Sequence, residues 1–527
     1  MLSKELKSKI DNLWDKFWSR GMANPLQAIE HISYLLFMRR LEQMDAEESK
    51  RSSYKSIFEG TWDTGKKDSE GDSITVEKRM LRWTVFKDFE TEERLTHVSQ
   101  YVFPFLKDLK EENSPYARHM QSANFFMPSA LLLEDAMRAI DEIFDYIEND
   151  KKAGQAFQDT QGDVYEYLLS ELKNAGKNGQ FRTPRHLIRF LVEILDPDIG
   201  DKICDPAAGT GGFLVAAYQY ILAKKSSEKK KIKDDDGFYN GLGNKIKDEK
   251  HWNQLKKETF YGYDIDSGMV RIGLMNLMLH GISYPHIENQ DTLSKKYDDD
   301  HKEGEFSMVL ANPPFTGKIS KNDKSDEFRI SSNSTELLFL ERIIKMLQPG
   351  GKGGVIIPEG VLFGSSKANR QLREIMAKDC QLEAVISLPS GVFKPYTGVK
   401  TAILVFTKAQ QDSNEFHTEK VWFYELKSDG YSLDDNRRRL KDSPLPQAVT
   451  DWEEREEKSS ENERKGQHFF VRLEEIQKND YDLSFNRYKE FVYEEQDYDS
   501  PKEILESLMA LENQILKEME ELRNLVG

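Results

Sequence analysis

Cysteine is scarce in this chain of 527 residues, which contains only Cys204 and Cys380. Two thiols exclude a framework of disulfide bonds and a four-thiolate metal site. No apolar run approaches the roughly 18 residues of a membrane-spanning helix, and residues 1–9 lack the apolar segment of a secretory signal. We therefore expect a cytoplasmic protein with no membrane contact and no metal centre.

An excess of positive charge is also missing, because the formal net charge is −17. A simple nucleic-acid coat protein would be basic, so the charge argues against that class. DNA can still be a substrate if a separate basic subunit supplies the phosphate contacts. The acidic residues are concentrated in the segments 298–300, 451–463 and 494–521. Apolar residues make up 38% of the chain, and its length allows roughly two to four globular domains.

The pattern of apolar residues divides the chain into three parts. Residues 1–150 have apolar residues at helical spacing and predict a helical N-terminal domain. In residues 151–480, short apolar runs alternate with helical stretches, which predicts an α/β domain with a Rossmann-like, doubly wound, mostly parallel sheet. The expected strands are 202–204, 259–263, 307–310, 354–357, 384–388 and 402–406. No helix separates the last two, so we expect them to form an antiparallel pair at one edge.

The remaining segments are more polar. A charged insertion at 224–257 is expected to be a surface loop, and residues 411–480 are expected to be irregular. Residues 481–527 predict a helical tail whose apolar residues keep heptad spacing from Ile504 to Leu525, with Glu518 at one core position. Two interpretations of this helix remain open: it binds a partner, or it packs on its own domain.

A glycine-rich turn, DPAAGTGGF at residues 205–213, follows the first expected strand of the sheet. Gly211 and Gly212 permit a tight turn and close approach of the backbone to a ligand. In dinucleotide-binding folds such a turn faces a pyrophosphate. Here Asp205 would repel phosphate and would suit a cationic amino acid. The chain also lacks the GxxxxGK[ST] sequence of a P-loop.

Two further carboxylates end expected strands. Asp264 ends the second strand, where an acid can accept hydrogen bonds from both hydroxyls of a ribose; alternatively, it caps the next helix. Asp291 closes the third strand and can accept from the exocyclic amine of an adenine, or can form a cap or turn. A nucleoside that carries an amino-acid cation is S-adenosylmethionine, so these acids and Asp205 predict a site for this cofactor.

The sequence NPPF, Asn312 to Phe315, follows another buried strand. Proline has no N–H to give to a sheet, so a strand-ending turn is one interpretation. The other is catalytic. The Asn312 side-chain oxygen and the Pro313 carbonyl can accept both N–H groups of a planar amine and favour its nucleophilic geometry, while Phe315 stacks on an extruded base. Positioning and electrostatics would then suffice for catalysis without a strong base.

In this order along the chain, the motifs resemble the modification (methyltransferase) subunit of type I restriction–modification systems, a family of adenine-N6 DNA methyltransferases. The resemblance covers most of the chain. It also includes GQFRTPR at 179–185, LMNLMLH at 274–280, GVFKPYTGVKT at 391–401 and YDLSFNRY at 481–488.

The resemblance implies a role for many of these residues. Asn312, Pro313, Pro314 and Phe315 match the catalytic tetrapeptide, and the segment from Gln180 matches one that covers the methionine part of the cofactor. With Asp205 and Asp291 included, the expected cofactor-binding residues are Gln180, Phe181, Arg182, Thr183, Pro184, Arg185, Asp205, Thr210, Gly211, Gly212, Asp264 and Asp291. At Arg182 the family usually has an aromatic residue, so no ring contact is carried over. Thr183 and Pro184 also suit the N-cap and first position of a helix.

The resemblance further implies an activity and partners. The activity is methyl transfer from S-adenosylmethionine to N6 of adenine in double-stranded DNA, with the target base flipped out of the helix. The partners are a specificity subunit that binds two copies of this chain and an ATP-driven restriction subunit. Two alternatives remain: a methyltransferase that acts on a protein glutamine or on RNA, and a binding module that keeps the cofactor fold without catalysis.

Overall fold

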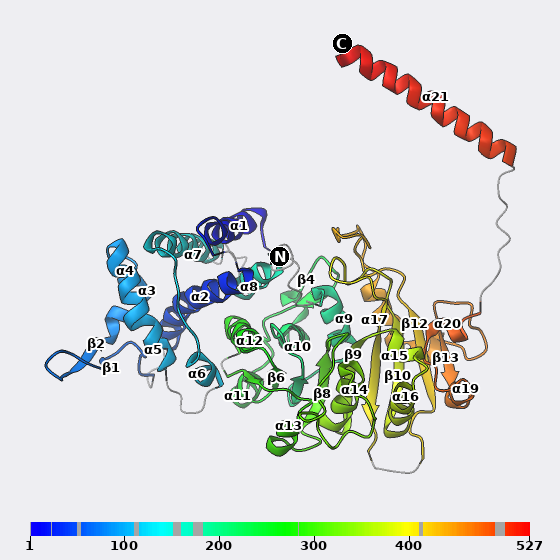
Figure 1. Cartoon of the computed structure of the whole chain (residues 1–527), viewed down its shortest axis with the longest axis horizontal. Helices are drawn as coiled ribbons and strands as arrows, with labels where there is room; N and C mark the ends of the chain where they lie inside the picture. The colour runs from blue at the N-terminus through cyan, green and yellow to red at the C-terminus, as the bar shows by residue number, and fades with distance from the viewer. Residues whose placement is uncertain are drawn as a thin grey trace.

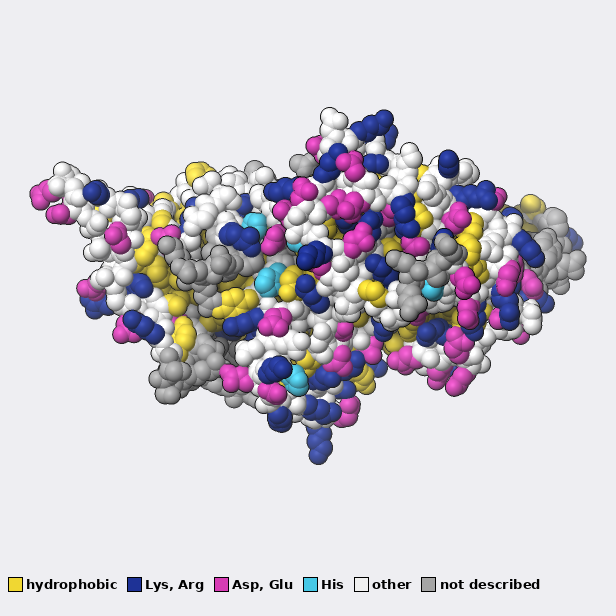
Figure 2. Space-filling view, turned by 90° about the horizontal axis from the view of Figure 1, so that it is seen from below, with side chains coloured by type: hydrophobic (Ala, Val, Ile, Leu, Met, Phe, Trp, Pro, Cys, Tyr) yellow, Lys and Arg dark blue, Asp and Glu magenta, His cyan; other side chains and the backbone are white. Residues whose placement is uncertain are grey.

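A computed structural model of the chain describes residues 2–22, 24–49, 54–109, 115–150, 160–171, 183–282, 284–410, 415–490 and 501–526. A helical N-terminal region, an α/β body and a single C-terminal helix follow one another along the chain (Figure 1). Figure 2 shows acidic and basic side chains interspersed over one face of the molecule. No helix within these ranges combines the length and the apolar character needed to cross a bilayer.

The N-terminal region is made of helices and one β-hairpin. Its elements are α1 (Lys4–Ser19), α2 (Pro25–Glu48), β1 (Thr61–Lys67), β2 (Ser73–Glu77), η1 (Lys78–Leu81), α3 (Trp83–Phe86), α4 (Thr91–His97), η2 (Val98–Val102), α5 (Phe103–Lys107), α6 (Pro115–Met120), α7 (Ala130–Asp150) and α8 (Thr160–Glu171). Helix α2 begins at Pro25, a residue suited to the first turn of a helix, and the Asn24 side chain caps it.

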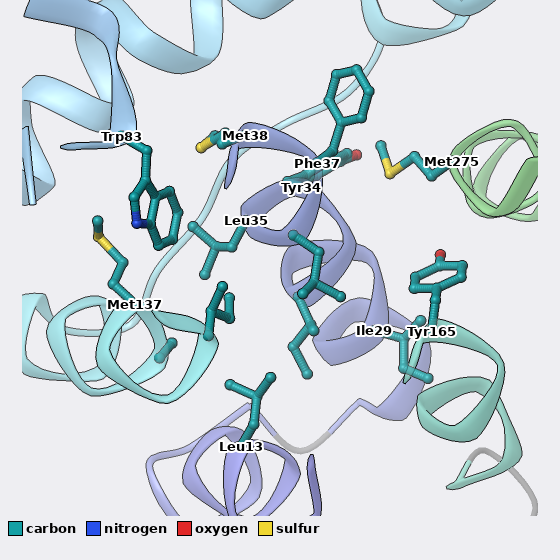
Figure 3. Packing of buried hydrophobic residues seen from close by; sticks show 14 of the residues in the cluster. Leu13, Ile29, Tyr34, Leu35, Phe37, Met38, Trp83, Met137, Tyr165 and Met275 are labelled. Carbon is teal, nitrogen blue, oxygen red and sulfur yellow. The ribbon is translucent and has the colours of Figure 1, made fainter. Parts of the chain in front are cut away.

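The core of this region is shared with the α/β body. Figure 3 shows Leu13, Leu35 and Tyr165 of α1, α2 and α8 around one apolar cluster. Met275 belongs to the same cluster, although it lies on α12 (Ser267–Leu279), a helix of the body. The two parts of the chain are therefore joined by a continuous buried surface.

A nine-stranded sheet forms the body, in the order β13-β12-β10-β11-β9-β8-β3-β6-β7. The strands are β3 (Ile203–Asp205), β6 (Phe260–Asp264), β7 (His286–Asn289), β8 (Phe306–Ala311), β9 (Leu347–Pro358), β10 (Cys380–Ser387), β11 (Thr401–Lys408), β12 (Lys420–Glu425) and β13 (His468–Arg472). The pairings from β9 to β7 are all parallel. The six strands expected from the sequence are present, and the mostly parallel sheet is confirmed.

The antiparallel pair of β10 and β11 is also confirmed, but its expected place at the edge is wrong. Strand β12 pairs parallel to β10, and β13 pairs antiparallel to β12. The four consecutive residues from Val421 to Tyr424 are buried, which explains why this short strand lies inside the sheet although its surroundings in the sequence are charged.

Helices cover both faces of the sheet, because neighbouring residues of a strand point in opposite directions. Ile203 and Met308 join one apolar core with α9 and α10, whereas Cys204 and Val309 join a second core with α14 and α16. The helices of the body are α9 (Arg185–Leu195), α10 (Gly212–Lys224), α12, α13 (Lys295–Asp300), α14 (Thr335–Met346), α15 (Gly360–Phe363), α16 (Lys367–Asp379), α17 (Leu445–Glu453), α18 (Arg455–Lys458), α19 (Leu473–Lys478) and α20 (Phe485–Tyr488).

The charged insertion at 224–257 is folded rather than a plain loop. It contains η4 (Glu228–Lys230), β4 (Ile232–Lys233), β5 (Tyr239–Asn240) and α11 (Glu249–Lys257). Phe238, Ile246 and Leu255 are buried in the core of the body, and these few apolar anchors hold an otherwise charged segment in place.

The last helix, α21 (Pro501–Val526), stands away from the body (Figure 1). Its residues 502–524 are all exposed, including the apolar Leu508, Leu511 and Ile515, which are 51–61% exposed. The interpretation that this helix packs on its own domain is therefore wrong for the described structure.

Candidate active site

The candidate site lies where the strand order of the sheet reverses. Strand β3 pairs with β6 on one side and with β8 on the other, and ligands of open α/β sheets bind at the carboxyl ends of strands at such a point. A cavity of about 520 Å³ lies there. Its lining includes Pro206, Ala207, Gly209, Asp264, Ile265, Asp291, Thr292, Asn312, Pro313, Pro314, Phe315, Lys318 and Phe339. The ends of four separate strands thus face one space.

The glycine-rich turn forms one wall of this cavity. Gly209 and Gly211 have φ of +52° and +74°, values that strain any residue with a side chain. A Cβ at Gly211 would also lie 2.5 Å from Leu277 Cδ1. The Gly211 N–H donates to the Ala208 carbonyl at 2.7 Å and closes the turn. Four expected residues of this turn do not line the cavity: Asp205, Thr210, Gly211 and Gly212. They shape the turn, and Gly209 of the same turn does line the cavity.

Asp205 is buried beneath the turn, and its carboxylate accepts the Ala207 N–H at 3.0 Å. Burial, together with the nearby Asp264 carboxylate, raises the pKa of Asp205 to about 8. A carboxyl that is neutral when alone and ionises beside a positive charge suits a cationic ligand.

Asp264 ties the end of β6 to the turn. Its carboxylate accepts the Gly209 N–H and the Asp266 N–H, each at 2.9 Å. The cap of α12 is Asp266, whose side chain accepts from Gly268 and Met269, so the interpretation of Asp264 as that cap is wrong. A carboxylate has about four lone-pair sites, which leaves capacity for a ligand hydroxyl. Burial raises the pKa of Asp264 above its usual value.

Asp291 forms a turn and also lies on the cavity wall. Its carboxylate accepts the Leu293 N–H at 2.9 Å, which forms a local turn. The residue also lines the cavity, next to Gln290 and Thr292. The Thr292 hydroxyl donates to the Pro206 carbonyl at 3.3 Å, so the turn after β7 is fastened to the glycine-rich turn.

The segment from Asn312 to Phe315 forms the opposite wall. The Asn312 Nδ2 donates to the Thr183 hydroxyl at 2.8 Å, whereas its Oδ1 is buried and accepts no hydrogen bond from any described residue. An unpaired buried acceptor costs about 1–3 kcal/mol, and such groups are rare in native structures. The Phe315 ring meets the buried Phe393 ring edge to face, with centroids 5.4 Å apart. The Asn312 oxygen, which accepts no hydrogen bond from the described residues, and the Phe315 ring, which packs on Phe393, therefore share one cavity with the acidic residues.

The segment matched to the methionine part of the cofactor is placed only in part. Gln180, Phe181 and Arg182 lie outside the described residues. Helix α9 begins at Arg185 with Pro184 as its N-cap and no side-chain cap bond, so the expected positions of Thr183 as N-cap and Pro184 as first residue are wrong by one. The Thr183 hydroxyl instead accepts from Asn312.

Pro184 and Arg185 lie at the start of the same helix. Pro184 precedes the first residue of α9. Arg185 pairs with Asp163 of α8 at 3.0 Å and lines a second cavity, of about 580 Å³, instead of the first.

Sequence reasoning did not single out several other residues of the cavity, among them Ile265, Lys318 and Phe339. Ile265 is 75% exposed. An isoleucine between two aspartates at the end of a strand could have been recognised as a candidate for an exposed apolar contact, because the residues on both sides of it are polar. Phe339 lies on α14 with a helical apolar pattern and gave no such signal.

Comparisons with known proteins identify the family of this chain. The N-6 DNA methylase family model matches residues 156–497, and the model of the HsdM N-terminal domain matches residues 6–169. The methylase subunit of the type I restriction enzyme EcoEI from Escherichia coli is 31% identical over 339 residues. That match covers 63% of this chain and 62% of the relative, so the chain spans less than two thirds of the relative's length.

Solved structures share the fold. A chain from a type I restriction–modification system, solved to explain complex assembly and conformational transition, is 28% identical, with a TM-score of 0.67. The alignment covers 99% of this chain and 98% of that one. The methyltransferase subunit of the Streptococcus thermophilus type I system has a TM-score of 0.65 at 20% identity, over 93% and 100% of the two chains. With a family model matched over more than half of its length, this chain belongs to the N-6 DNA methylase family.

Proposed function

We propose that this chain transfers a methyl group from S-adenosylmethionine to N6 of adenine in double-stranded DNA, as the modification subunit of a type I restriction–modification system. One observation carries the proposal: a single cavity is lined by Asp264, Asp291 and Asn312, and the Asn312 Oδ1 has no donor among the described residues. The two carboxylates can accept hydrogen bonds from the cofactor, and the Asn312 oxygen can accept one from the adenine amine.

The residues of the cavity fit the parts of the cofactor. Asp264 can accept from ribose hydroxyls, Asp291 from the exocyclic amine of the adenine, and Ile265 offers an exposed apolar surface to the ring. Asp205, buried beneath the turn, would supply a negative charge only when a bound cationic group favours its ionised form. The segment from Gln180 to Arg185 is assigned to the methionine part by resemblance. Bound S-adenosylmethionine supplies an electrophilic methyl group.

Asn312 and Pro313 act on the amine of the flipped adenine. Its lone pair is delocalised into the ring, which makes it a poor nucleophile. If Asn312 Oδ1 and the Pro313 carbonyl accept its two N–H groups, the nitrogen moves toward a tetrahedral geometry and its lone pair becomes available to the methyl carbon. The bond from that carbon to the sulfonium sulfur would break as the new N–C bond forms, and the amine would release one proton to solvent. Phe315 stacks on the base and keeps it in line. The donated bond from Asn312 Nδ2 to Thr183 leaves Oδ1 for the substrate.

The partners follow from charge and from α21. With a net charge of −17, the chain depends on another subunit for much of its contact with DNA phosphates. We assign this role to a specificity subunit that binds two copies of this chain, with α21 as the contact. A restriction subunit would complete the nuclease complex.

Two substitutions test the reaction. In Asn312→Ala and Phe315→Ala, the cofactor dissociation constant should stay within about threefold, because neither residue is one of the acids proposed to bind the cofactor. Methyl transfer to DNA should fall by at least about 100-fold, as expected for the loss of a preorganised transition-state contact. Calorimetry measures the first quantity and tritiated methyl transfer the second, with Asn462→Ala on the exposed surface as the matched control.

The labelled product identifies the substrate. N6-methyladenine in duplex DNA supports the proposal. Label in RNA or in a protein glutamine would favour the alternative enzymes, and undiminished turnover in Asn312→Ala would remove the role assigned to this amide.

A further inference from the structure

Helix α12 lies between the glycine-rich turn and the N-terminal helical region. On one side it packs against α2, α6 and α8. On the other side it comes within contact distance of the turn, because Gly273 has no side chain: a Cβ there would lie 3.0 Å from the Gly209 carbonyl oxygen. Figure 3 shows Met275 of α12 and Tyr165 of α8 in the same cluster. A single helix therefore touches both the N-terminal region and the turn.

Asn276 connects these two contacts. It is fully buried, and its Nδ2 donates to the Thr210 carbonyl at 2.9 Å and to Glu166 Oε1 of α8 at 2.8 Å. Both partners can only accept, which fixes the nitrogen end of the amide without ambiguity. The Oδ1 of Asn276 is buried without a donor among the described residues. This costs stability, so stabilisation of the core does not by itself account for the arrangement.

The bond to Thr210 restrains a flexible part of the turn. Gly211 follows directly and has φ of +74°, a conformation that glycine leaves easily. With the Thr210 carbonyl held by Asn276 of α12, rotation of the peptide between these residues is restrained. Asp264 of β6 accepts from the Gly209 N–H and holds this residue of the turn. The turn is thus held at Gly209 by Asp264 of the body, and at Thr210 by Asn276, which is itself hydrogen-bonded to Glu166 of the N-terminal region.

We propose that Asn276 and Glu166 are positioning residues through which the N-terminal helical region sets the shape of the glycine-rich turn and hence the affinity for the cofactor. The inference rests on the proposed cofactor site. It gives a role to Asn276 in the sequence LMNLMLH, which the reaction itself does not use. Because coupling is reciprocal, bound cofactor should in turn stabilise the contact between α8 and α12.

Three variants of the full-length chain separate positioning from packing. Asn276→Asp removes both donors and places a carboxylate beside Glu166, so it should lower the melting temperature and raise the cofactor dissociation constant by about tenfold or more. In the double variant Asn276→Asp with Glu166→Gln, the amide introduced on α8 can donate to the carboxylate introduced on α12, but the Thr210 carbonyl still lacks a donor. Melting temperature should recover while the dissociation constant stays raised.

Glu30→Gln is the matched control. Glu30 of α2 pairs with Arg271 of α12 at 2.6 Å across the same interface, and this ion pair includes no residue of the turn. The variant should lower the melting temperature and leave cofactor affinity unchanged. Wild-type affinity in Asn276→Asp, or recovery of both quantities in the double variant, would overturn the proposal.

Amide hydrogen exchange without cofactor provides an independent readout. Residues 208–212 should exchange faster in Asn276→Asp and in the double variant than in Glu30→Gln or the wild type. If the wild type binds no S-adenosylmethionine and this exchange pattern still holds, the proposed cofactor is wrong and the positioning role stands. Unchanged exchange in Asn276→Asp would contradict the positioning role whatever the cofactor.

Discussion

At the scale of single residues, the polar groups at the strand ends are held in place before any ligand arrives. Asp264 is fixed by two backbone N–H groups, and the Asn312 amide is fixed by Thr183. Such preorganisation lowers the cost of arranging dipoles around the reacting atoms. The wall of the cavity therefore includes side chains that are also hydrogen-bonded to the surrounding fold.

Thr183 gives a direct test of this arrangement. Thr183→Val keeps the shape of the side chain but removes the acceptor for Asn312 Nδ2, so the amide can turn its oxygen away from the amine. We expect the single-turnover rate to fall by about 10- to 100-fold, and the cofactor dissociation constant to change little. Thr183→Ser should restore most of the rate. A loss of cofactor affinity with an unchanged rate would instead place Thr183 in the cofactor site, as the resemblance implies.

Asp205 predicts a pH dependence of cofactor binding. Its pKa is raised to about 8, so it is mostly protonated at neutral pH, and a bound cation favours the ionised form. Binding below about pH 8 should release a proton, and affinity should rise with pH up to that value by at most about tenfold per unit. Calorimetry in buffers of different ionisation enthalpy measures this proton. Asp205→Asn should abolish the release; an equal release in that variant would assign it to another group.

The same shift predicts the sign of an effect on stability. Because the folded protein holds the Asp205 proton more tightly than the unfolded chain, its contribution to stability is fully present in acid and is lost as the pH rises through about 8. Melting curves of the wild type and of Asp205→Asn should therefore diverge in their pH dependence between about pH 4 and 8.

At the scale of elements, α21 is a helix whose apolar residues are not buried by any other described part of the chain. It is a helix of 26 residues with an exposed apolar stripe, and isolated helices gain little stability from propensity alone. A partner that buries Leu508, Leu511 and Ile515 would supply the missing stabilisation.

A pair of charge substitutions tests this contact. Leu511→Glu places a charge on the apolar stripe, whereas Asn513→Glu places the same charge on the opposite side of the helix. Leu511→Glu should weaken co-purification with the specificity subunit by at least about tenfold and leave cofactor binding unchanged. Asn513→Glu serves as the control. Equal recovery of the subunit with both variants, or with residues 501–527 deleted, would remove α21 from the interface.

At the scale of the whole molecule, charge limits how this chain can meet DNA. The net charge is −17, and the face in Figure 2 mixes both signs instead of presenting a basic surface. Affinity for duplex DNA depends on neutralised phosphates and falls steeply with salt. The chain is therefore expected to supply chemistry while a partner supplies much of the electrostatic attraction.

The salt dependence of binding checks this division. The chain alone should bind duplex DNA with a dissociation constant weaker than about 10 μM at physiological salt, and with a shallow slope against salt concentration. Adding the specificity subunit should tighten binding and steepen the slope. Fluorescence anisotropy over a salt series measures both quantities. A slope for the chain alone as steep as that of the complex would contradict the expected role of the partner.

Much of the fold could be predicted from the sequence, because short-range patterns of apolar residues indicate most of the strands. Six strands were visible as short apolar runs, and the antiparallel pair of β10 and β11 was indicated by the absence of a helix between them. Strand β12 was missed because charged residues surround its short buried run. The insertion at 224–257 was misjudged for the same reason, since only Phe238, Ile246 and Leu255 anchor it.

The sequence alone determined the chemistry of this protein: which strand ends carry acids, where glycine permits a tight turn, and where two prolines stop a strand. These properties depend on residue type and short spacing. Only the tertiary structure decided that Thr183 meets Asn312, 129 positions away, and that Glu166 meets Asn276, 110 positions away. Such contacts follow from the packing of distant helices and strands, and no local periodicity encodes which buried polar groups will face each other once that packing is complete.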